Sequence, residues 1–306
     1  MIAAQITLAI TGGTGFVGKR LIALARDRGY RIRALARRAQ PAQDGITWIE
    51  GSLEDTDSLA RLTEGADVAI HVAGVVNAPN LPDFLRGNAG GTANMIAAAE
   101  AAGVRRFVHV SSLSAREPKL SHYGHSKQLA EAEVRASGLD WTIVRPPAIY
   151  GPGDMEMRDV FRLARMGLAL LPPPGRMSII HVDDLARLLI TLAETDPGRL
   201  VLDPDDGVPG GWTHTGFARA VGAAVGRSVL PLPLPKALLA LAAYADKAFR
   251  GADAKLTQDR VGYLVHPDWT SDPKHRPDPA VWQPEIATPA GLAETARWYR
   301  ANGLLG

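Results

Sequence analysis

Cysteine is absent from all 306 residues, which excludes disulfide bonds, thiolate catalysis and cysteine-ligated metal centres. An excess of one charge is also absent: 34 Lys and Arg face 32 Asp and Glu, which leaves a net charge of +2. That balance excludes a protein that wraps nucleic acid through bulk charge. With 46% hydrophobic and 22% charged residues, the chain is typical of a folded globular protein. Its length suits one large domain or two associated ones.

Long hydrophobic runs are missing as well. The longest apolar stretch, Ala237–Ala245, is about half of what a bilayer crossing requires. No basic segment precedes the apolar run at the N-terminus, so we expect neither a signal peptide nor an integral membrane segment, and we expect a cytoplasmic protein. Ala237–Ala245 follows Pro231, Pro233 and Pro235 and is expected to form an amphipathic or buried helix. Contact of this segment with a membrane surface stays open.

Short β-branched and aliphatic runs alternate with longer helical segments through the first half of the chain. This alternation is typical of an α/β fold with a Rossmann-type, doubly wound parallel sheet. Such a sheet binds its ligands at the carboxyl ends of the strands, so functional residues should follow strands directly. The expected strands cover residues 6–10, 31–36, 47–49, 68–72, 107–110 and 141–144, and a helix is expected over residues 126–137.

The composition changes near residue 150, after which proline and glycine become frequent. We therefore expect residues 1–150 to form a dinucleotide-binding domain. Residues 178–200, a strand and a helix, are expected to return to that domain. Residues 151–177 and 201–306 are expected to form a smaller, loop-rich substrate lobe.

A glycine-rich segment, TGGTGFVG at residues 11–18, follows the first strand and opens the first helix. Gly12 suits a tight turn, Gly15 allows a pyrophosphate to approach the backbone, and Gly18 allows close packing of the helix. The N-terminus of the helix supplies amide groups and a favourable dipole to the anion. This strand–turn–helix context predicts a dinucleotide site. Its expected contacts are Gly12, Thr14, Gly15, Phe16, Val17 and Gly18.

The residues after the second strand bear on the choice of cofactor. Ala36 stands where NAD-binding proteins usually carry an acidic residue, and Arg37 and Arg38 follow it. A guanidinium suits a 2′-phosphate, so the sequence favours NADP through Arg37, with NAD as the alternative. Ser52, after the third strand, is expected to contact the adenine.

Three polar residues near the end of the fifth strand predict the chemistry. Ser112 ends that strand, and Tyr123 and Lys127 follow with the four-residue spacing that puts two side chains on one helical face. A nearby ammonium lowers the pKa of a phenol toward the working range. Tyr123 is then suited to proton transfer and Ser112 to a hydrogen bond with a substrate oxygen, while nicotinamide supplies the hydride. We predict Ser112, Tyr123 and Lys127 as catalytic residues.

Together these motifs resemble the extended-type short-chain dehydrogenases/reductases, the NAD-dependent epimerase/dehydratase-like family. The resemblance runs from residue 6 to about residue 190, in the order of the family's motifs. Further matching segments are HVAG at 71–74, Asn88 with Gly91-Thr92, RPPAIYGPG at 145–153 and HVDD at 181–184.

The resemblance implies a role for each matching residue. Tyr123 would be the acid/base, Lys127 would hold the nicotinamide ribose, and Ser112 would orient the substrate. Ala73 and Pro146 would lie against the cofactor. Asn88 would make either a structural or proton-relay contact, or cap a helix.

Two departures from the family's pattern narrow the function. No carboxylate follows Ser112 until Glu117, which disfavours dehydration, and the eleven residues from Ser112 to Tyr123 leave little chain for a sugar-nucleotide site. We predict an NADP-dependent oxidoreductase acting on a carbonyl or alcohol of a small organic substrate. The alternatives are a nucleotide-sugar epimerase with tightly bound NAD and a non-catalytic dinucleotide-binding sensor or assembly factor. No metal is expected, because HVDD at 181–184 suits an N-cap and a packing contact better. A homodimer stays open.

Overall fold

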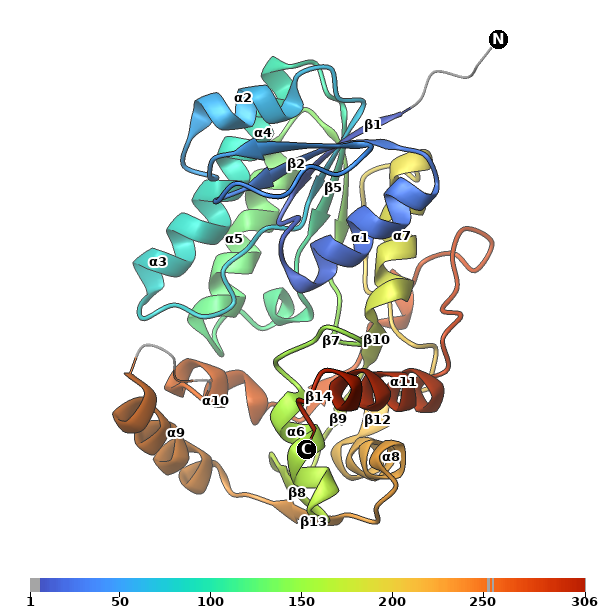
Figure 1. Cartoon of the computed structure of the whole chain (residues 1–306). Coiled ribbons are helices and arrows are strands. Elements are labelled where there is room, and N and C mark those ends of the chain that lie inside the picture. Colours follow the sequence, from blue (N-terminus) through green and yellow to red (C-terminus); the bar gives the residue numbers. More distant parts are fainter. Residues whose placement is uncertain (1–5, 252–253, 255, 306) are drawn as a thin grey trace. The chain divides into compact units, whose positions relative to one another are not determined.

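The computed structural model describes residues 6–251, 254 and 256–305. The chain divides into two compact units, each made of two separate stretches of the sequence (Figure 1). Unit 1 comprises Met1–Arg145 and Leu185–Leu202, and unit 2 comprises Pro146–Asp184 and Asp203–Gly306. Within the described residues, no helix has both the length and the apolar content needed to cross a bilayer.

Unit 1 is built on a seven-stranded sheet in which every neighbouring pair is parallel. The strand order is β11-β6-β5-β4-β1-β2-β3, so the chain winds outward from β1 in both directions. This is the predicted doubly wound fold. The strands are β1 (Thr7–Thr11), β2 (Arg31–Ala36), β3 (Ile46–Glu50), β4 (Val68–His71), β5 (Arg106–Val110), β6 (Asp140–Val144) and β11 (Leu200–Leu202).

Helices cover both faces of this sheet, with α2 to α5 on one side and α1 and α7 on the other (Figure 1). A core of fully buried side chains, among them Leu59, Met95, Phe107 and Val134, fills one side of the sheet. The helical segments are α1 (Phe16–Asp27), α2 (Thr56–Thr63), α3 (Leu81–Leu85), the π-turn η1 (Arg86–Gly90), α4 (Gly91–Ala101), the 3₁₀ turn η2 (Leu113–Arg116), α5 (His122–Ala136) and α7 (Val182–Glu194).

Three elements differ from the sequence expectations. The helix expected from Ser126 begins at His122, because the Ser121 hydroxyl accepts the Gly124 amide and caps it. The strand expected at 178–180 does not join the main sheet: β10 (Ile179–His181) pairs with β7 (Ala148–Tyr150) in unit 2. The seventh strand of the main sheet is β11, which was not expected.

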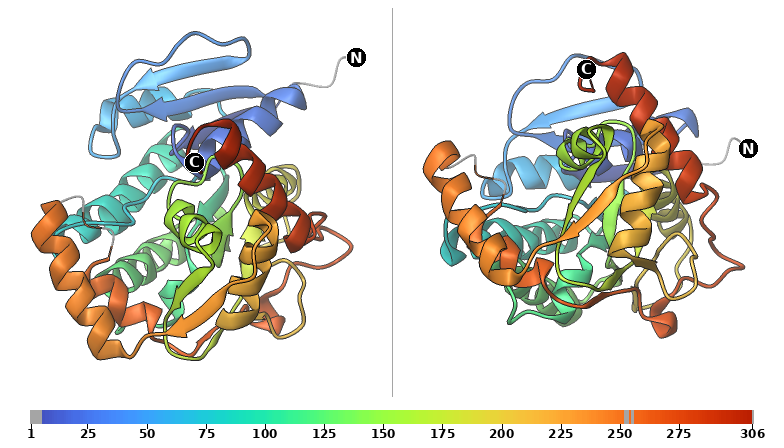
Figure 2. Two further views of the ribbon diagram at one scale, coloured as in Figure 1. Left: turned by 60° about the horizontal axis from the view of Figure 1, so that its bottom comes forward. Right: turned by 90° about the horizontal axis from the view of Figure 1, so that it is seen from below.

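Unit 2 combines three small sheets with helices. The sheets are β10-β7, β12-β9-β14 and β13-β8. Tyr150, Phe161, Leu292 and Tyr299 are fully buried in a core where α8 contacts both α6 and α11 (Figure 2). The further elements are α6 (Arg158–Arg165), β8 (Leu168–Leu171), β9 (Arg176–Met177), β12 (Trp212–Thr213), α8 (His214–Val225), β13 (Leu230–Pro233), α9 (Lys236–Arg250), α10 (Gln258–Leu264), β14 (Asp268–Trp269), η4 (Pro273–His275) and α11 (Thr288–Ala301).

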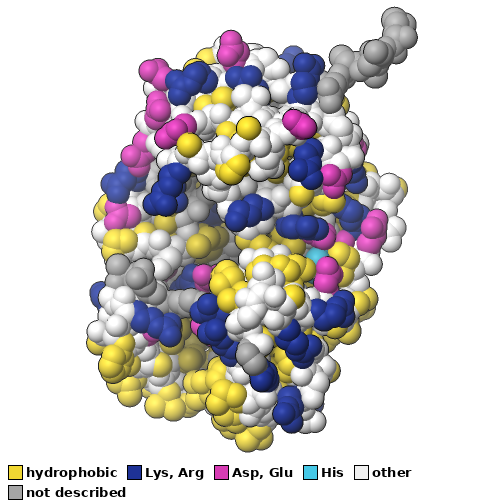
Figure 3. Space-filling model, viewed as in Figure 1, with side chains coloured by type: hydrophobic (Ala, Val, Ile, Leu, Met, Phe, Trp, Pro, Cys, Tyr) yellow, Lys and Arg dark blue, Asp and Glu magenta, His cyan; other side chains and the backbone are white. Residues whose placement is uncertain are grey.

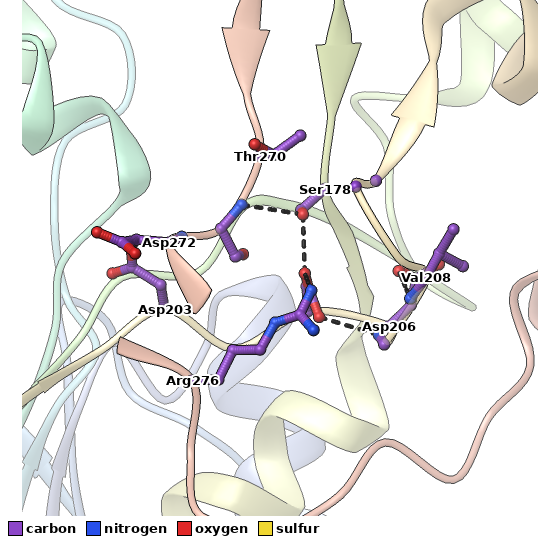
Figure 4. A network of polar contacts seen from close by, with 12 residues as sticks. Ser178, Asp203, Asp206, Val208, Thr270, Asp272 and Arg276 are labelled. Carbon is purple, nitrogen blue, oxygen red and sulfur yellow. Dashed lines mark hydrogen bonds and ion pairs between the residues drawn. The ribbon is translucent and has the colours of Figure 1, made fainter. Parts of the chain in front are cut away.

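A buried carboxylate organises the loops of unit 2 (Figure 4). Asp205 Oδ2 accepts hydrogen bonds from Ser178 Oγ at 2.9 Å and from Arg276 Nη2 at 3.0 Å. Ser178 Oγ in turn accepts the Ser271 amide at 3.0 Å. Asp205 Oδ1 accepts the Gly207 amide, and Gly207 has the positive φ (77°) of a tight turn. These hydrogen bonds hold the loops that contain Ser178, Asp205 and Ser271 together, although no long strand runs through them.

Candidate active site

The carboxyl ends of β1, β4 and β5 bring three functional loops together. In the sheet Thr11 pairs with His71, and His71 pairs with His109, so the loops that follow these strands lie side by side. The Ala73 amide donates to Thr11 Oγ1 at 3.1 Å and ties the loop after β4 to the end of β1. The glycine loop and the Ser112 segment therefore open onto one edge of unit 1.

The glycine loop is so tight that side chains at two of its positions would collide with backbone. Gly12 has a φ of +73°, and a Cβ there would lie 2.7 Å from the Ala73 nitrogen. This confirms the tight turn expected at Gly12. A Cβ on Gly18 would overlap the Gly12 carbonyl, so Gly18 packs against the loop itself. Gly15 and Thr14 are exposed at the tip, where a ligand can approach the backbone.

The N-terminus of α1 fits an anionic group. Helix α1 begins at Phe16 after Gly15, no side chain caps it, and its first turn contains no acidic residue. The first amides of a helix have no partner inside the helix and carry the positive end of its dipole. Phe16 and Val17 supply two of these amides. The loop and the helix therefore suit the pyrophosphate of a dinucleotide.

The two arginines after β2 are uncommitted. Arg37 and Arg38 are exposed, and neither guanidinium forms a hydrogen bond or ion pair with any of the residues described. By contrast, Arg33 within β2 pairs with Glu64 at 3.6 Å. Ser52 is partly committed, because its hydroxyl accepts the Glu54 amide at 3.2 Å. The Arg37 guanidinium is therefore available to bind a ligand, whereas the Ser52 hydroxyl already accepts one hydrogen bond.

The two serines after β5 have different surroundings. Ser111 is buried, and its hydroxyl donates to Glu131 Oε1 at 2.6 Å. Ser112 is half-buried, and its hydroxyl oxygen accepts the Ser114 amide at 3.2 Å. Accepting that bond leaves the Ser112 proton available for a substrate oxygen.

Lys127 is a buried cation beside the loop that follows β4. Its Nζ donates to the Val110 carbonyl at 2.9 Å. Burial lowers the pKa of Lys127 from 10.5 to about 8, against the opposing effect of the Glu131 carboxylate. A Cβ on Gly74 would lie 3.5 Å from Lys127 Nζ, so the backbone of Gly74 lies directly beside this amine.

A glycine that the sequence analysis did not single out brings Tyr123 to the Ser112 segment. A Cβ on Gly124 would lie 2.6 Å from the Ser114 carbonyl, so the first turn of α5 packs directly against η2. Tyr123 precedes Gly124 in that turn, half-buried, with its ring centroid 6.2 Å from that of Phe84. The chain between Ser112 and Tyr123 therefore folds back, so that the start of α5 lies against the residues that follow Ser112.

Asn88 links the loop after β4 to α5. Its Oδ1 accepts the Val75 amide at 2.7 Å, and its Nδ2 donates to the Val75 carbonyl at 3.0 Å and to Ser126 Oγ at 2.8 Å. Asn88 lies inside the π-turn η1, between α3 and α4, so the helix-cap alternative is wrong.

Glu131 anchors the helix that carries Tyr123 and Lys127. It is 2% exposed and lies one turn beyond Lys127. Arg145, at the end of β6, donates to both carboxylate oxygens, at 2.7 and 2.6 Å, and Arg135 donates at 3.0 Å. With Ser111 this makes four hydrogen bonds to one carboxylate. The i, i+4 spacing from Lys127 was the only local signal of this role.

Two histidines behind the site are buried. His71 Nδ1 shares a hydrogen bond with Thr11 Oγ1 at 2.7 Å, and its Nε2 shares one with Thr92 Oγ1 at 3.1 Å. His109 stacks on His71 with ring centroids 5.4 Å apart. Burial and the nearby Lys127 charge lower the pKa of His71 to about 3 and that of His109 well below 6.5. Both rings are therefore neutral.

The lowered pKa values of these two histidines predict that the fold loses stability in acid. The unfolded state binds protons at His71 below pH 6.5, whereas the folded state binds one only near pH 3, so stability falls as pH falls through that window. At pH 5 His71 alone should cost about 2 kcal/mol of unfolding free energy relative to pH 8, and His109 adds in the same direction. Urea unfolding at both pH values measures the loss. His71→Asn should make the unfolding free energy depend less on pH, whereas His125→Asn, at a half-buried residue, should leave this dependence unchanged. The same pH dependence in the wild type and both variants would show that His71 does not cause it.

The remaining predicted residues belong to unit 2. Pro146 is its first residue, and its contact with the cofactor stays a prediction. In HVDD, Asp184 is fully buried, and its two carboxylate oxygens accept the Glu285 and Ile286 amides, each at 3.1 Å. The expected packing role of this motif is confirmed.

The fold and the site of unit 1 define a class: an enzyme that binds a nicotinamide dinucleotide on a parallel sheet. The family model described as NAD(P)H-binding matches residues 12–195. Ceramide reductase of Caulobacter vibrioides is 37% identical over 99% of this chain and 97% of its own length. A farnesyl-dihydroquinoline-oxide ketoreductase of Stigmatella aurantiaca is 32% identical over 65% of this chain and 68% of its own.

Solved structures share the fold at lower identity. A human epimerase family protein solved with NADPH has a TM-score of 0.74 at 22% identity, covering 96% of this chain and 99% of its own. The Bordetella bronchiseptica enzyme WbmG solved with NAD has a TM-score of 0.76 at 19% identity, covering 99% of this chain and 96% of its own. The chain belongs to the extended short-chain dehydrogenase/reductase family and is an NAD(P)-binding oxidoreductase.

Proposed function

We propose that this enzyme reduces a ketone on a lipid of the ceramide type, with NADPH as the preferred hydride donor. The observation that carries the chemistry is the position of Ser112, Tyr123 and Lys127 at the carboxyl end of β5, beside the loop after β4. The lipid class rests on the similarity to ceramide reductase. That similarity covers 99% of the chain and so includes unit 2, where the substrate lobe was expected.

Each of the three residues has a defined task in this reaction. When bound, the reduced nicotinamide supplies a hydride to the carbonyl carbon and becomes oxidised. Ser112 donates a hydrogen bond to the carbonyl oxygen and fixes its position. Tyr123 gives its phenolic proton to the same oxygen, so that the C=O becomes an alcohol. The Lys127 ammonium, one turn along α5, stabilises the phenolate that remains.

The direct test uses purified protein, a long-chain N-acyl amino ketone dispersed in detergent, and NADPH or NADH. We expect the absorbance of the reduced nicotinamide to fall and mass spectrometry to show a product heavier by two hydrogen atoms. NAD retained through purification, with a change of stereochemistry and no net consumption of added cofactor, would instead support the epimerase alternative. Cofactor binding without turnover of any ketone would support the non-catalytic alternative.

The preference for NADPH is proposed to depend on Arg37. The Arg37→Glu variant should bind NADPH about 10- to 100-fold more weakly, because a charge-assisted hydrogen bond contributes roughly 1.5–3 kcal/mol. Affinity for NADH should change little. Thermal shifts with NAD, NADH, NADP and NADPH in parallel rank the four affinities. Arg105→Glu is the matched control, since Arg105 is 82% exposed and precedes β5 at the opposite edge of the sheet. Equal losses for NADPH and NADH in Arg37→Glu would remove Arg37 from cofactor selection.

A further inference from the structure

We propose that one face of unit 2 binds the surface of a lipid bilayer that carries anionic headgroups. This face, the α9 face, consists of the outward side of α9 and the adjoining edge of β8 and β13. Its apolar residues are Met166, Leu170, Leu230, Leu232, Leu238, Leu241, Tyr244 and Phe249. Membrane binding through this face concerns where the enzyme works and does not require the proposed reaction.

Helix α9 has two apolar sides, of which only one is packed. Leu239 and Ala243 are buried and cluster with Val261 of α10. Leu241 is 65% exposed and Phe249 is 90% exposed. Residues 238, 241, 245 and 249 are spaced by three or four and so form one stripe along the helix. Without a binding partner, this apolar stripe is in contact with water.

The exposed apolar residues are concentrated on the α9 face. Thirteen large hydrophobic side chains are exposed among the described residues, and eight of them belong to it. In β13 and β8 the exposed Leu232 and Leu170 are paired in register, and β13 leads directly into α9. Figure 3 shows hydrophobic atoms gathered over α9 and over β8 and β13. Large exposed apolar patches mark binding surfaces.

The charge around this face selects the kind of partner. Residues 158–171 and 227–250 carry seven Lys and Arg against two Asp, although the whole chain has a net charge of only +2. Lys236 and Lys247 are eleven residues apart, about three helical turns, so they share one line along α9, and Arg250 follows one turn later. All three are exposed. This line lies on the side of α9 away from the apolar stripe. An apolar face with aromatic residues opposite a cationic face is typical of a helix that lies in an anionic membrane interface.

The same charge argues against a second copy of this chain as the partner. A symmetric dimer through the α9 face would bring the net positive charge of residues 158–171 and 227–250 in one copy toward the same charge in the other. Like charges at a contact oppose association. A bilayer surface with anionic headgroups offers the opposite charge to the cations and a hydrocarbon boundary to Leu241 and Phe249.

The test is cosedimentation of the full-length protein with phosphatidylcholine vesicles, with and without phosphatidylglycerol, in the absence of cofactor and substrate. We expect binding to the phosphatidylglycerol vesicles that weakens with added salt. The double variant Leu241→Ser/Phe249→Ser should partition at least tenfold less. The control Val281→Ser, a change at a 40% exposed residue of unit 2 outside this face, should bind like the wild type. Lys236→Gln/Lys247→Gln should lose the dependence on phosphatidylglycerol.

Several results would overturn the proposal. These are no binding of the wild type to either vesicle, or unchanged binding of both double variants. A concentration-dependent dimer in analytical ultracentrifugation that Leu241→Ser/Phe249→Ser abolishes would assign the face to a second copy. Thermal unfolding checks that each variant is folded, and the lysine variant tests the proposal without altering an apolar contact. Because no ketone is added, failure of the proposed reaction leaves this measurement unaffected.

Discussion

Replacing Tyr123 with Phe should reduce turnover by about 10²- to 10⁴-fold, the usual contribution of a positioned acid or base. The phenyl ring keeps the contact with Phe84, whose centroid lies 6.2 Å away, so the fold of the first turn of α5 should not change. Only the proton that the carbonyl oxygen must receive is lost. Ketone reduction measures the effect, and the thermal shift with NADPH should stay near its wild-type value.

Tyr30→Phe is the matched control for this variant. The Tyr30 hydroxyl bonds to Glu194, and Tyr30 directly precedes β2, at the amino-terminal edge of the same sheet. Its loss removes a phenol from unit 1 far along the strands from Ser112, so turnover should be unaffected. Full activity in Tyr123→Phe would require a different proton donor and would refute the assigned chemistry.

Replacing Glu131 with Ala should lower the free energy of unfolding by about 3–5 kcal/mol, the cost of removing one partner from a buried ion pair. Arg145 would lose both of its charge-assisted hydrogen bonds, and the buried Ser111 hydroxyl would lose its acceptor. Urea unfolding at neutral pH measures this change. Ketone reduction should fall as well, because α5 carries Tyr123 and Lys127.

Glu133→Ala separates the buried network from a general effect of lost helix charge. Glu133 lies on the same helix and is exposed, so its replacement should change stability by less than about 0.5 kcal/mol. Replacing the pair together, as Glu131→Leu/Arg145→Met, should restore part of the stability, because neither charge is then buried alone. Equal, small effects of Glu131→Ala and Glu133→Ala would show that the four hydrogen bonds contribute little.

Most of the fold and the core of the candidate site could be predicted from the sequence, because they depend on residues that are close together in the chain. The alternation of strands and helices predicted the parallel sheet, and the glycine spacing predicted the turn at Gly12, which only a glycine readily adopts. The four-residue spacing of Tyr123 and Lys127 predicted that they share one face of a helix, and this prediction requires no tertiary contact. The start of α5 at His122 was missed, because Ser121 resembles any other loop serine until its hydroxyl is seen to accept the Gly124 amide.

Other features were decided only by residues far apart in the chain. Strand β11 joins the sheet because Leu200–Leu202 pairs with β6, a partner almost sixty residues earlier. Asn88 reaches Ser126, a contact without any local sequence signal, and Glu131 is neutralised by Arg145 from the end of β6, a partner that its spacing from Lys127 does not reveal. The sequence of Ala237–Ala245 allowed a buried or an interfacial helix. Packing decided that Leu239 and Ala243 face α10 while Leu241 and Phe249 remain exposed, because a helix can turn only one side to its neighbour.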